Sequence, residues 1–236
     1  MPRRSRIIVP GVPLHIIQRG NNRQACFFGE EDYLFYLDWL SEYAKSTDCL
    51  IHAFVLMTNH VHLLLTPEKP DSAGNLLKRL GQRYVQYINR TYKRSGTLWE
   101  GRFRSCIIQQ QEHLFSCQRY IEMNPVRAGI VQHPGEYRWS SYQTNGQGKG
   151  FAFIRHHPLY LGLGRTDAKR QMAYRELFRF ELESGEINAI RKATNGNFAL
   201  GSKRFQQEIG EMLGRRVTPG KAGRPRKKKG RGGGKA

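Results

Sequence analysis

The amino-acid sequence predicts an α+β fold: a ferredoxin-like split βαβ sheet with packed helices, then a small helical C-terminal module and a disordered basic tail. Three observations support this prediction. Segments within residues 1–143 follow the order β, α, β, β, α, β, α, in which the middle strands form a hairpin. A glycine-rich linker at 144–150 precedes three further helical segments within 144–214. Residues 215–236 contain ten Lys and Arg, no acidic residue and no apolar run, a composition typical of disorder.

Each element follows from a local pattern. The helix expected at 30–47 has apolar residues at helical spacing, and the helix at 72–95 follows a Pro-Asp-Ser cap. The helix at 111–123 ends where Asn124 precedes Pro125, because a residue before proline is displaced from helical angles. In chain order, the expected strands are 14–18, 50–57, 60–66 and 106–109, and the expected helices are 30–47, 72–95, 111–123, 166–184, 186–193 and 202–213.

Composition restricts the class of partner. The chain has 236 residues and a formal net charge of +20, half of which comes from the tail. Such an excess predicts a polyanionic partner, and nucleic acid is favoured over a membrane surface. No apolar run approaches the ~20 residues that span a bilayer, so no membrane partner is expected. Four scattered cysteines without C-x-x-C spacing argue against a disulfide framework and a zinc knuckle. These features predict a cytoplasmic, nucleoid-associated protein.

A pair of histidines begins the second strand of the expected hairpin. Side chains two apart in a strand point to the same face, so His60 and His62 can approach one cation. Val61, Leu63 and Leu65 would fill the other face. Taken alone the pair is a weak signal, because half-buried histidines satisfied by hydrogen bonds are commoner than metal ligands.

The helix at 111–123 carries a second set of candidates. Counting in steps of four, three and four from His113 gives Cys117, Tyr120 and Asn124 on one stripe. This stripe could place a phenol and an amide oxygen beside the paired histidines. Two imidazoles with an amide oxygen suit Mg²⁺ or Mn²⁺, whereas a cysteine ligand would have indicated zinc. By spacing alone, such a stripe is more often part of the core.

Several of these residues lie in motifs that resemble a known family. His60-Val61-His62 resembles the His-hydrophobic-His motif of the HUH single-strand endonucleases. Residues 119–129 (RYIEMNPVRAG) resemble the tyrosine helix of the REP-associated tyrosine transposases, single-tyrosine relatives of the transposases that mobilise insertion sequences as single-stranded DNA. Residues 19–24 (RGNNRQ) and 96–103 (GTLWEGRF) also resemble that family. The resemblance covers roughly residues 8–143, with four motifs in the same order.

The resemblance implies a metal-dependent single-strand DNA transposase that cleaves and rejoins DNA next to hairpin, REP-like elements. Tyr120 would be the nucleophile and would form a 5′-phosphotyrosine link. His60 and His62 would be two ligands of Mg²⁺ or Mn²⁺, and Asn124 the third. Many relatives have glutamine at this last position, and asparagine is one methylene shorter. Because each site has one tyrosine, excision and rejoining would need a homodimer or sequential turnover.

Residues outside the metal site would select the single-stranded or hairpin DNA. The candidates are Arg19, Asn21, Asn22 and Arg23 for the hairpin, Arg83, Arg90, Arg102 and Arg104 for the backbone, and Trp99 for base stacking. Trp99 suits a core position equally well. In the tail, Arg224 and Arg226 lie in an AT-hook-like core that would enter a narrow minor groove. A generic polycation explains these two residues equally well.

Two other functions stay open at this point. One is a DNA-binding regulator of palindromic repeats that keeps the fold without strand transfer; the intact His60, His62, Tyr120 and Asn124 argue against it. The other is a ferredoxin-like RNA-binding protein with structural histidines. It would bind RNA and DNA equally and would be indifferent to EDTA.

Overall fold

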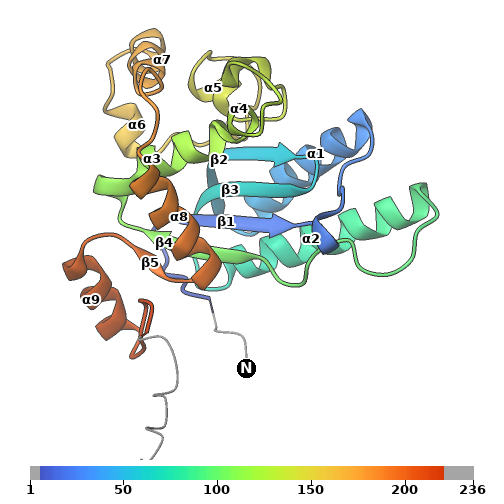
Figure 1. The fold of residues 1–236 in the computed structure, drawn as a ribbon, viewed down its shortest axis with the longest axis horizontal. Helices are drawn as coiled ribbons and strands as arrows, with labels where there is room; N and C mark the ends of the chain where they lie inside the picture. Colours follow the sequence, from blue (N-terminus) through green and yellow to red (C-terminus); the bar gives the residue numbers. More distant parts are fainter. Residues whose placement is uncertain (1–5, 221–236) are drawn as a thin grey trace, which may run out of the picture.

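The protein, described by a computed structural model over residues 6–220, is built on one five-stranded sheet (Figure 1). The strand order is β2 (Cys49–Met57), β3 (His60–Pro67), β1 (Leu14–Arg19), β4 (Arg104–Ile108) and β5 (Ala199–Leu200). The first three pairings are antiparallel, and β4–β5 is parallel. The order β2-β3-β1-β4 is that of a split βαβ unit, so the predicted fold class is confirmed.

Helices cover both faces of the sheet (Figure 1). One core joins the sheet to α1 (Glu30–Ser46) and α2 (Ser72–Thr91), and a second joins its other face to α3 (Gln110–Glu122) and α8 (Ser184–Gly196). The remaining elements are η1 (Asn21–Arg23), α4 (Asn124–Arg127), η2 (Pro134–Glu136), α5 (Tyr142–Asn145), α6 (Pro158–Leu161), α7 (Asp167–Glu176) and α9 (Lys203–Met212). None of the helices formed by residues 6–220 is long and apolar enough to cross a membrane.

Alternation along β3 sorts its side chains between the two cores, as expected. Val61, Leu63 and Leu65 are buried in the core with α1 and α2. His62 and Leu64 point to the opposite face, where Leu64 joins the core that contains α3 and α8. The candidate histidines therefore face the helix that carries Tyr120.

The C-terminal half is integrated with the sheet more closely than the sequence predicts. The stretch at 144–150 is not a free linker, because Asn145 is fully buried and donates hydrogen bonds to the Glu122 carboxylate and to the carbonyl of His52. The two-residue strand β5, too short to have a recognisable pattern, extends the sheet. Packed structure also extends past the boundary predicted at Arg215, since Val217 is buried and its carbonyl accepts a hydrogen bond from the amide of Ala199.

Candidate functional site

A hollow of about 300 Å³ opens where β1, β3, α3 and α8 meet. It is lined by His15, Ile17, Arg19, His60, His62, Tyr120, Asn124, Arg191, Thr194 and Asn195. The four residues that the sequence predicts for chemistry therefore line one surface. Of the remaining stripe on α3, Cys117 is fully buried in the core, because only the last turn of the helix reaches the hollow.

A chain of hydrogen bonds fixes the orientation of His62. The hydroxyl of Thr194 donates to the carbonyl of Ile190, so its oxygen accepts the Nδ1–H of His15 (2.9 Å). In neutral His15 the other nitrogen, Nε2, then accepts from Nδ1–H of His62 (2.8 Å). This assignment leaves the Nε2 lone pair of His62 available. Burial lowers the pKa of His15 to about 3 and that of His62 well below its ordinary value, so both rings are neutral at neutral pH.

His60 is held by its neighbour in the β2–β3 turn. Its Nδ1 lies 2.6 Å from Oδ1 of Asn59, an acceptor, so Nδ1 carries the proton and Nε2 has a free lone pair. The rings of His60 and His62 lie 5.1 Å apart between centroids. Burial, with the nearby charge of Arg19, lowers the pKa of His60 to about 4. Both histidines are therefore in the state that binds a metal ion.

Asn124 follows directly after the break in the tyrosine helix. Its Nδ2 donates to the carbonyls of Tyr120 (2.9 Å) and Ile121 (3.1 Å) in the last turn of α3. Both amide hydrogens are thereby used, which leaves the Oδ1 of this hollow-lining side chain as a free acceptor. The predicted end of the helix at Asn124-Pro125 is confirmed, and a short second helix, α4, begins there.

In the described part of the chain, Tyr120, like the fully buried Tyr36, lacks the hydrogen bond that four other buried tyrosines donate. The hydroxyls of Tyr84, Tyr137, Tyr160 and Tyr174 all donate to carbonyl or carboxylate oxygens. The hydroxyl of Tyr120 has no hydrogen-bond partner among residues 6–220, although the residue is only 6% exposed. Its ring lies 5.7 Å from those of His15 and His62, and the Arg127 guanidinium lies 4.5 Å from its centroid. The phenol is thus unengaged beside two imidazoles and a cation.

The donors at this hollow fit a hard divalent cation. Nε2 of His60, Nε2 of His62 and Oδ1 of Asn124 each keep a lone pair, because their other polar atoms are already hydrogen-bonded. Within the described part of the chain, no group of three or more His, Cys, Asp or Glu side chains could hold a metal. A site here thus depends on the asparagine oxygen, and a set of two imidazole nitrogens and one amide oxygen can hold a divalent metal ion.

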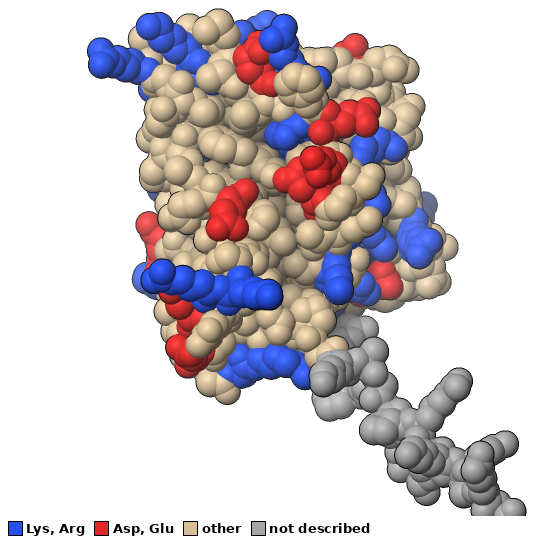
Figure 2. All heavy atoms as spheres, turned by 60° about the vertical axis from the view of Figure 1, so that its left-hand side comes forward, with Lys and Arg blue, Asp and Glu red and all other residues tan. Residues whose placement is uncertain are grey.

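A basic trough continues from the hollow past the end of β1, at Arg19, and the start of β4, at Arg104. Arg19 and Asn195 line both the hollow and a second depression, and Arg102 and Arg104 line this depression and a third one of about 420 Å³, which Arg6 borders. Glu100 is the acidic residue that lines both the second and the third depression. On the face in Figure 2, by contrast, Lys, Arg, Asp and Glu are interspersed. Arginines along a trough suit a phosphate backbone.

The remaining DNA-contact candidates lie apart from the hollow. Asn22 and Arg23 are exposed in η1 and Asn21 is half-buried there, and this turn is tied to Asn59, whose Nδ2 donates to the carbonyl of Arg23. Arg83 and Arg90 are on α2, across the sheet from Tyr120. Arg83 pairs with Glu42 (3.0 Å). Arg224 and Arg226 lie outside the described residues.

The assignment of Trp99 to base stacking was wrong. Its side chain is 5% exposed and packs in the core beside Tyr36 and Tyr84, whose rings lie 6.5 and 6.0 Å away. Its isolated bridge to Gly20 places it beside β1 rather than on the surface. A tryptophan in a short glycine-containing segment has the same local signal in a loop and in a core, and here the apolar area of the ring decides the outcome.

Sequence reasoning missed three residues at this site. His15 lies among Leu14, Ile16 and Ile17 in β1, and pairing that strand with the one containing His62 would have identified it. Arg127 lies in the quoted motif 119–129, but its contact with Tyr120 depends on the turn at Pro125. Arg191 lies on α8, which no local signal connects to the sheet.

The fold and the site together define a split βαβ sheet whose central strand presents two histidines to a tyrosine helix. Residues 9–124 match the family described as "Transposase IS200 like". This segment of the chain is similar to that transposase family, and the resemblance found in the sequence is confirmed.

Individual relatives agree with this assignment. A Haemophilus influenzae protein named as a REP-associated tyrosine transposase is 25% identical over 103 residues, which are 39% of this chain and 58% of that protein. The match thus spans little more than half of the relative. The structure of a REP-associated tyrosine transposase bound to a REP hairpin has a TM-score of 0.56 at 17% identity, covers 67% of this chain and 93% of its own, and supports the fold. A transposase structure from Deinococcus radiodurans has 24% identity over 51% of this chain and 96% of its own, with a TM-score of 0.37, too low to support an inference.

Proposed function

We propose that the protein is a metal-dependent single-strand DNA transposase that cleaves and rejoins DNA next to hairpin elements through Tyr120. The observation that carries this proposal is the meeting of an unpaired phenol with three free ligand atoms, from His60, His62 and Asn124, in one hollow. A histidine pair that served only the core would have both nitrogens of each ring satisfied within the protein. Here each ring forms a hydrogen bond through Nδ1, and Nε2 has no hydrogen-bond partner among residues 6–220.

The protein's own residues prepare the cation site. Nε2 of His60, Nε2 of His62 and Oδ1 of Asn124 would hold Mg²⁺ or Mn²⁺. When bound, the ion would supply Lewis-acid chemistry, neutralising charge on the oxygens of the scissile phosphate. His15 would keep His62 in the required tautomer by accepting its Nδ1–H, the usual role of an outer partner to a ligand histidine.

In the proposed cleavage, the Tyr120 oxygen attacks the scissile phosphorus. A bond forms between the phenolic oxygen and phosphorus, and the bond from phosphorus to the 3′ oxygen breaks. The phenolic proton is lost to solvent, and the departing oxygen gains one to become a 3′-hydroxyl. A phenol is a weak nucleophile at neutral pH, and the Arg127 guanidinium, 4.5 Å from the ring centroid, adds positive charge beside the attacking group. Because the phosphotyrosine link remains an ester, a 3′-hydroxyl can reverse the step without ATP.

The basic trough would hold the single-stranded flank of the substrate. Arg19 and Arg191 border the hollow itself, and Arg102 and Arg104 continue the line of positive charge away from Tyr120. The solved relative bound to a REP hairpin supports hairpin DNA as the substrate class. A single strand would suit the trough because its phosphates can follow a curved basic surface.

Cleavage of DNA hairpins with randomised single-stranded flanks, followed by sequencing of the ends, tests the proposed function. With Mg²⁺ or Mn²⁺ present, we expect breaks at a fixed distance from the hairpin within a short preferred sequence. Uncut DNA under all metal conditions, despite hairpin binding, would instead indicate a regulator that binds without strand transfer.

A further inference from the structure

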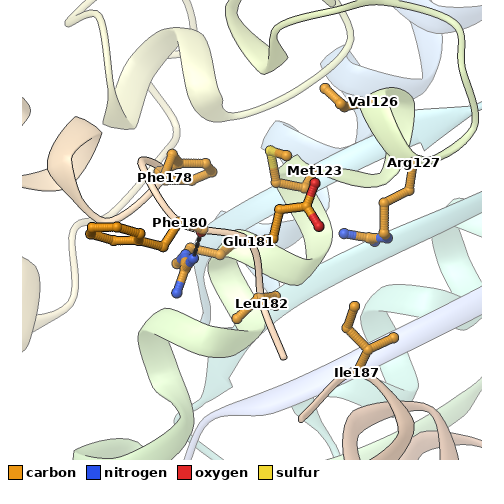
Figure 3. A pocket seen from close by; sticks show the side chains of 9 residues that line it. Met123, Val126, Arg127, Phe178, Phe180, Glu181, Leu182 and Ile187 are labelled. Atoms are coloured by element: carbon orange, nitrogen blue, oxygen red, sulfur yellow. Dashed lines mark hydrogen bonds between the residues drawn. The ribbon is translucent and has the colours of Figure 1, made fainter. Parts of the chain in front are cut away.

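A separate pocket of about 170 Å³ is lined by Arg127, whose guanidinium also contacts the ring of Tyr120. It is lined by Arg119, Met123, Val126, Arg127, Phe178, Phe180, Glu181, Leu182 and Ile187 (Figure 3). In Figure 3, Arg127 lies on one side of the pocket and Phe178 and Phe180 lie on the other. The walls thus combine the end of the tyrosine helix and α4 with the connection between α7 and α8. We call this cavity the flank pocket.

The two phenylalanine side chains of the flank pocket, Phe178 and Phe180, differ in packing and exposure. Phe178 is fixed, because its ring packs against those of Tyr142 and Tyr174, with centroids 4.9 and 5.3 Å away. Phe180 is 80% exposed at the rim, the most exposed large apolar side chain among residues 6–220. Packing within the fold does not account for an aromatic ring in this position. An exposed ring beside a cavity is a platform on which a planar group can stack.

Two arginines and one carboxylate, that of Glu181, line the flank pocket, which leaves an excess of positive charge there. Arg119 donates to the carbonyl of Phe180, and Arg127 donates to the carbonyl of Tyr120. Neither forms an ion pair with any carboxylate in the described chain, and the Nε atoms of both are buried without a hydrogen-bond partner. Burial lowers the pKa of Arg127 to about 10, which keeps the side chain charged at neutral pH. Half-buried guanidinium groups that form no ion pair favour a phosphate.

The flank pocket is adjacent to the proposed chemistry. Arg127 lines this pocket, and its guanidinium lies 4.5 Å from the ring centroid of Tyr120, which lines the hollow. Arg119 directly precedes Tyr120 on α3. A strand whose phosphate lies at Tyr120 would therefore have its next nucleotide near Arg127.

We propose that the flank pocket binds one unpaired nucleotide next to the scissile phosphate, with its base against Phe180 and Phe178 and a phosphate at Arg119 and Arg127. This inference rests on the proposed function and adds a recognition site to it. The volume is below the roughly 300 Å³ where pockets for drug-sized ligands begin, and it suits a single base. The carboxylate of Glu181 can accept a hydrogen bond from the amino group of a base, which would favour cytosine, adenine or guanine over thymine.

The test is a double-mutant cycle between Phe180→Ala and loss of a base. The probe is a DNA hairpin with short single-stranded flanks in which one position at a time is abasic, and affinity is measured by fluorescence anisotropy. We expect base loss at one flank position to weaken wild-type binding roughly 5- to 150-fold, the change that corresponds to ~1–3 kcal/mol per stacked base. In Phe180→Ala, base loss at that position should have no further effect.

Met172→Ala is the matched control, because Met172 is 57% exposed on α7 and does not line the flank pocket. Its sensitivity to base loss should equal that of the wild type. Equal losses in wild type and Phe180→Ala at every position would overturn the proposed pocket, while DNA cleavage by the wild type would leave the proposed function intact. A wild type that neither binds nor cleaves any hairpin probe would overturn both.

Discussion

Replacing His15 tests the link between the β1 strand and the proposed cation site. In the wild type, His15 accepts the Nδ1–H of His62 at 2.8 Å and is itself held by Thr194 at 2.9 Å. In His15→Leu the Nδ1–H of His62 has no acceptor, so the ring is free to rotate or to move its proton to Nε2, the atom proposed to bind the metal. Outer partners of ligand histidines typically change metal affinity 10- to 100-fold. We therefore expect Mn²⁺ binding about 10- to 100-fold weaker, measured by titration calorimetry without DNA.

Two further variants separate this effect from a general loss of stability. In His15→Gln the side-chain carbonyl can accept the same hydrogen bond, so most of the Mn²⁺ affinity should return. His52→Leu is the matched control: His52 is 2% exposed and bonded through both nitrogens, to Arg155 and Thr66, outside the hollow. Each Leu variant should lose about 1–3 kcal/mol of stability through unpaired buried groups. Mn²⁺ binding by His15→Leu as tight as that of His52→Leu would refute the role given to His15.

Three further results are expected. Trp99→Ala should lower the free energy of unfolding by ~3–5 kcal/mol in urea titrations. Its hairpin affinity should be unchanged under conditions where the variant is folded. Lost affinity without lost stability would contradict the core position of Trp99. Arg102→Gln should reduce the slope of log affinity against log salt concentration by about 0.7. Arg83→Gln should leave this slope unchanged, because Arg83 lies across the sheet and pairs with Glu42. Equal effects of the two variants would contradict DNA binding in the trough. The pKa of His60 is lowered from its ordinary value of 6.5 to about 4, so the ring stays neutral and its lone pair stays free at pH 6. Calorimetry should therefore find Mn²⁺ affinity nearly constant from pH 8 to pH 6. A steep fall in affinity over that range would contradict the burial of the site.

The fold was predictable because its elements have local signals. Alternation and helical periodicity located β1–β4 and the long helices, and Pro125 marked the end of α3. The strand β5 was not predictable, since two residues have no period. The packing of the 144–150 stretch was also not predictable. It depends on Glu122, a buried carboxylate that accepts from Ser141, Asn145 and Tyr174, and only the folded chain brings these donors together.

The candidate site was predictable to the extent that one strand or one helix determines it. His60 and His62 share a face because of strand alternation, and Tyr120 and Asn124 share a stripe because of helical spacing. Contacts between elements far apart in sequence had no such signal. The pairing of His15 with His62 requires the β1–β3 register, and Trp99 was misassigned because its burial depends on α1 and α2.

Covalent capture of DNA tests the central claim most directly. The wild type, Tyr120→Phe and Tyr137→Phe are incubated with a hairpin labelled at its 3′ end, with Mn²⁺ or with EDTA, and labelled protein is detected after denaturation. Tyr137 is a suitable control because its buried hydroxyl already donates to the carbonyl of Leu56. The labelled strand should remain attached to the wild type and to Tyr137→Phe with Mn²⁺ only, and Tyr120→Phe should carry no label. A labelled Tyr120→Phe would show that another residue is the nucleophile, and labelling of the wild type in EDTA would contradict the role given to the cation.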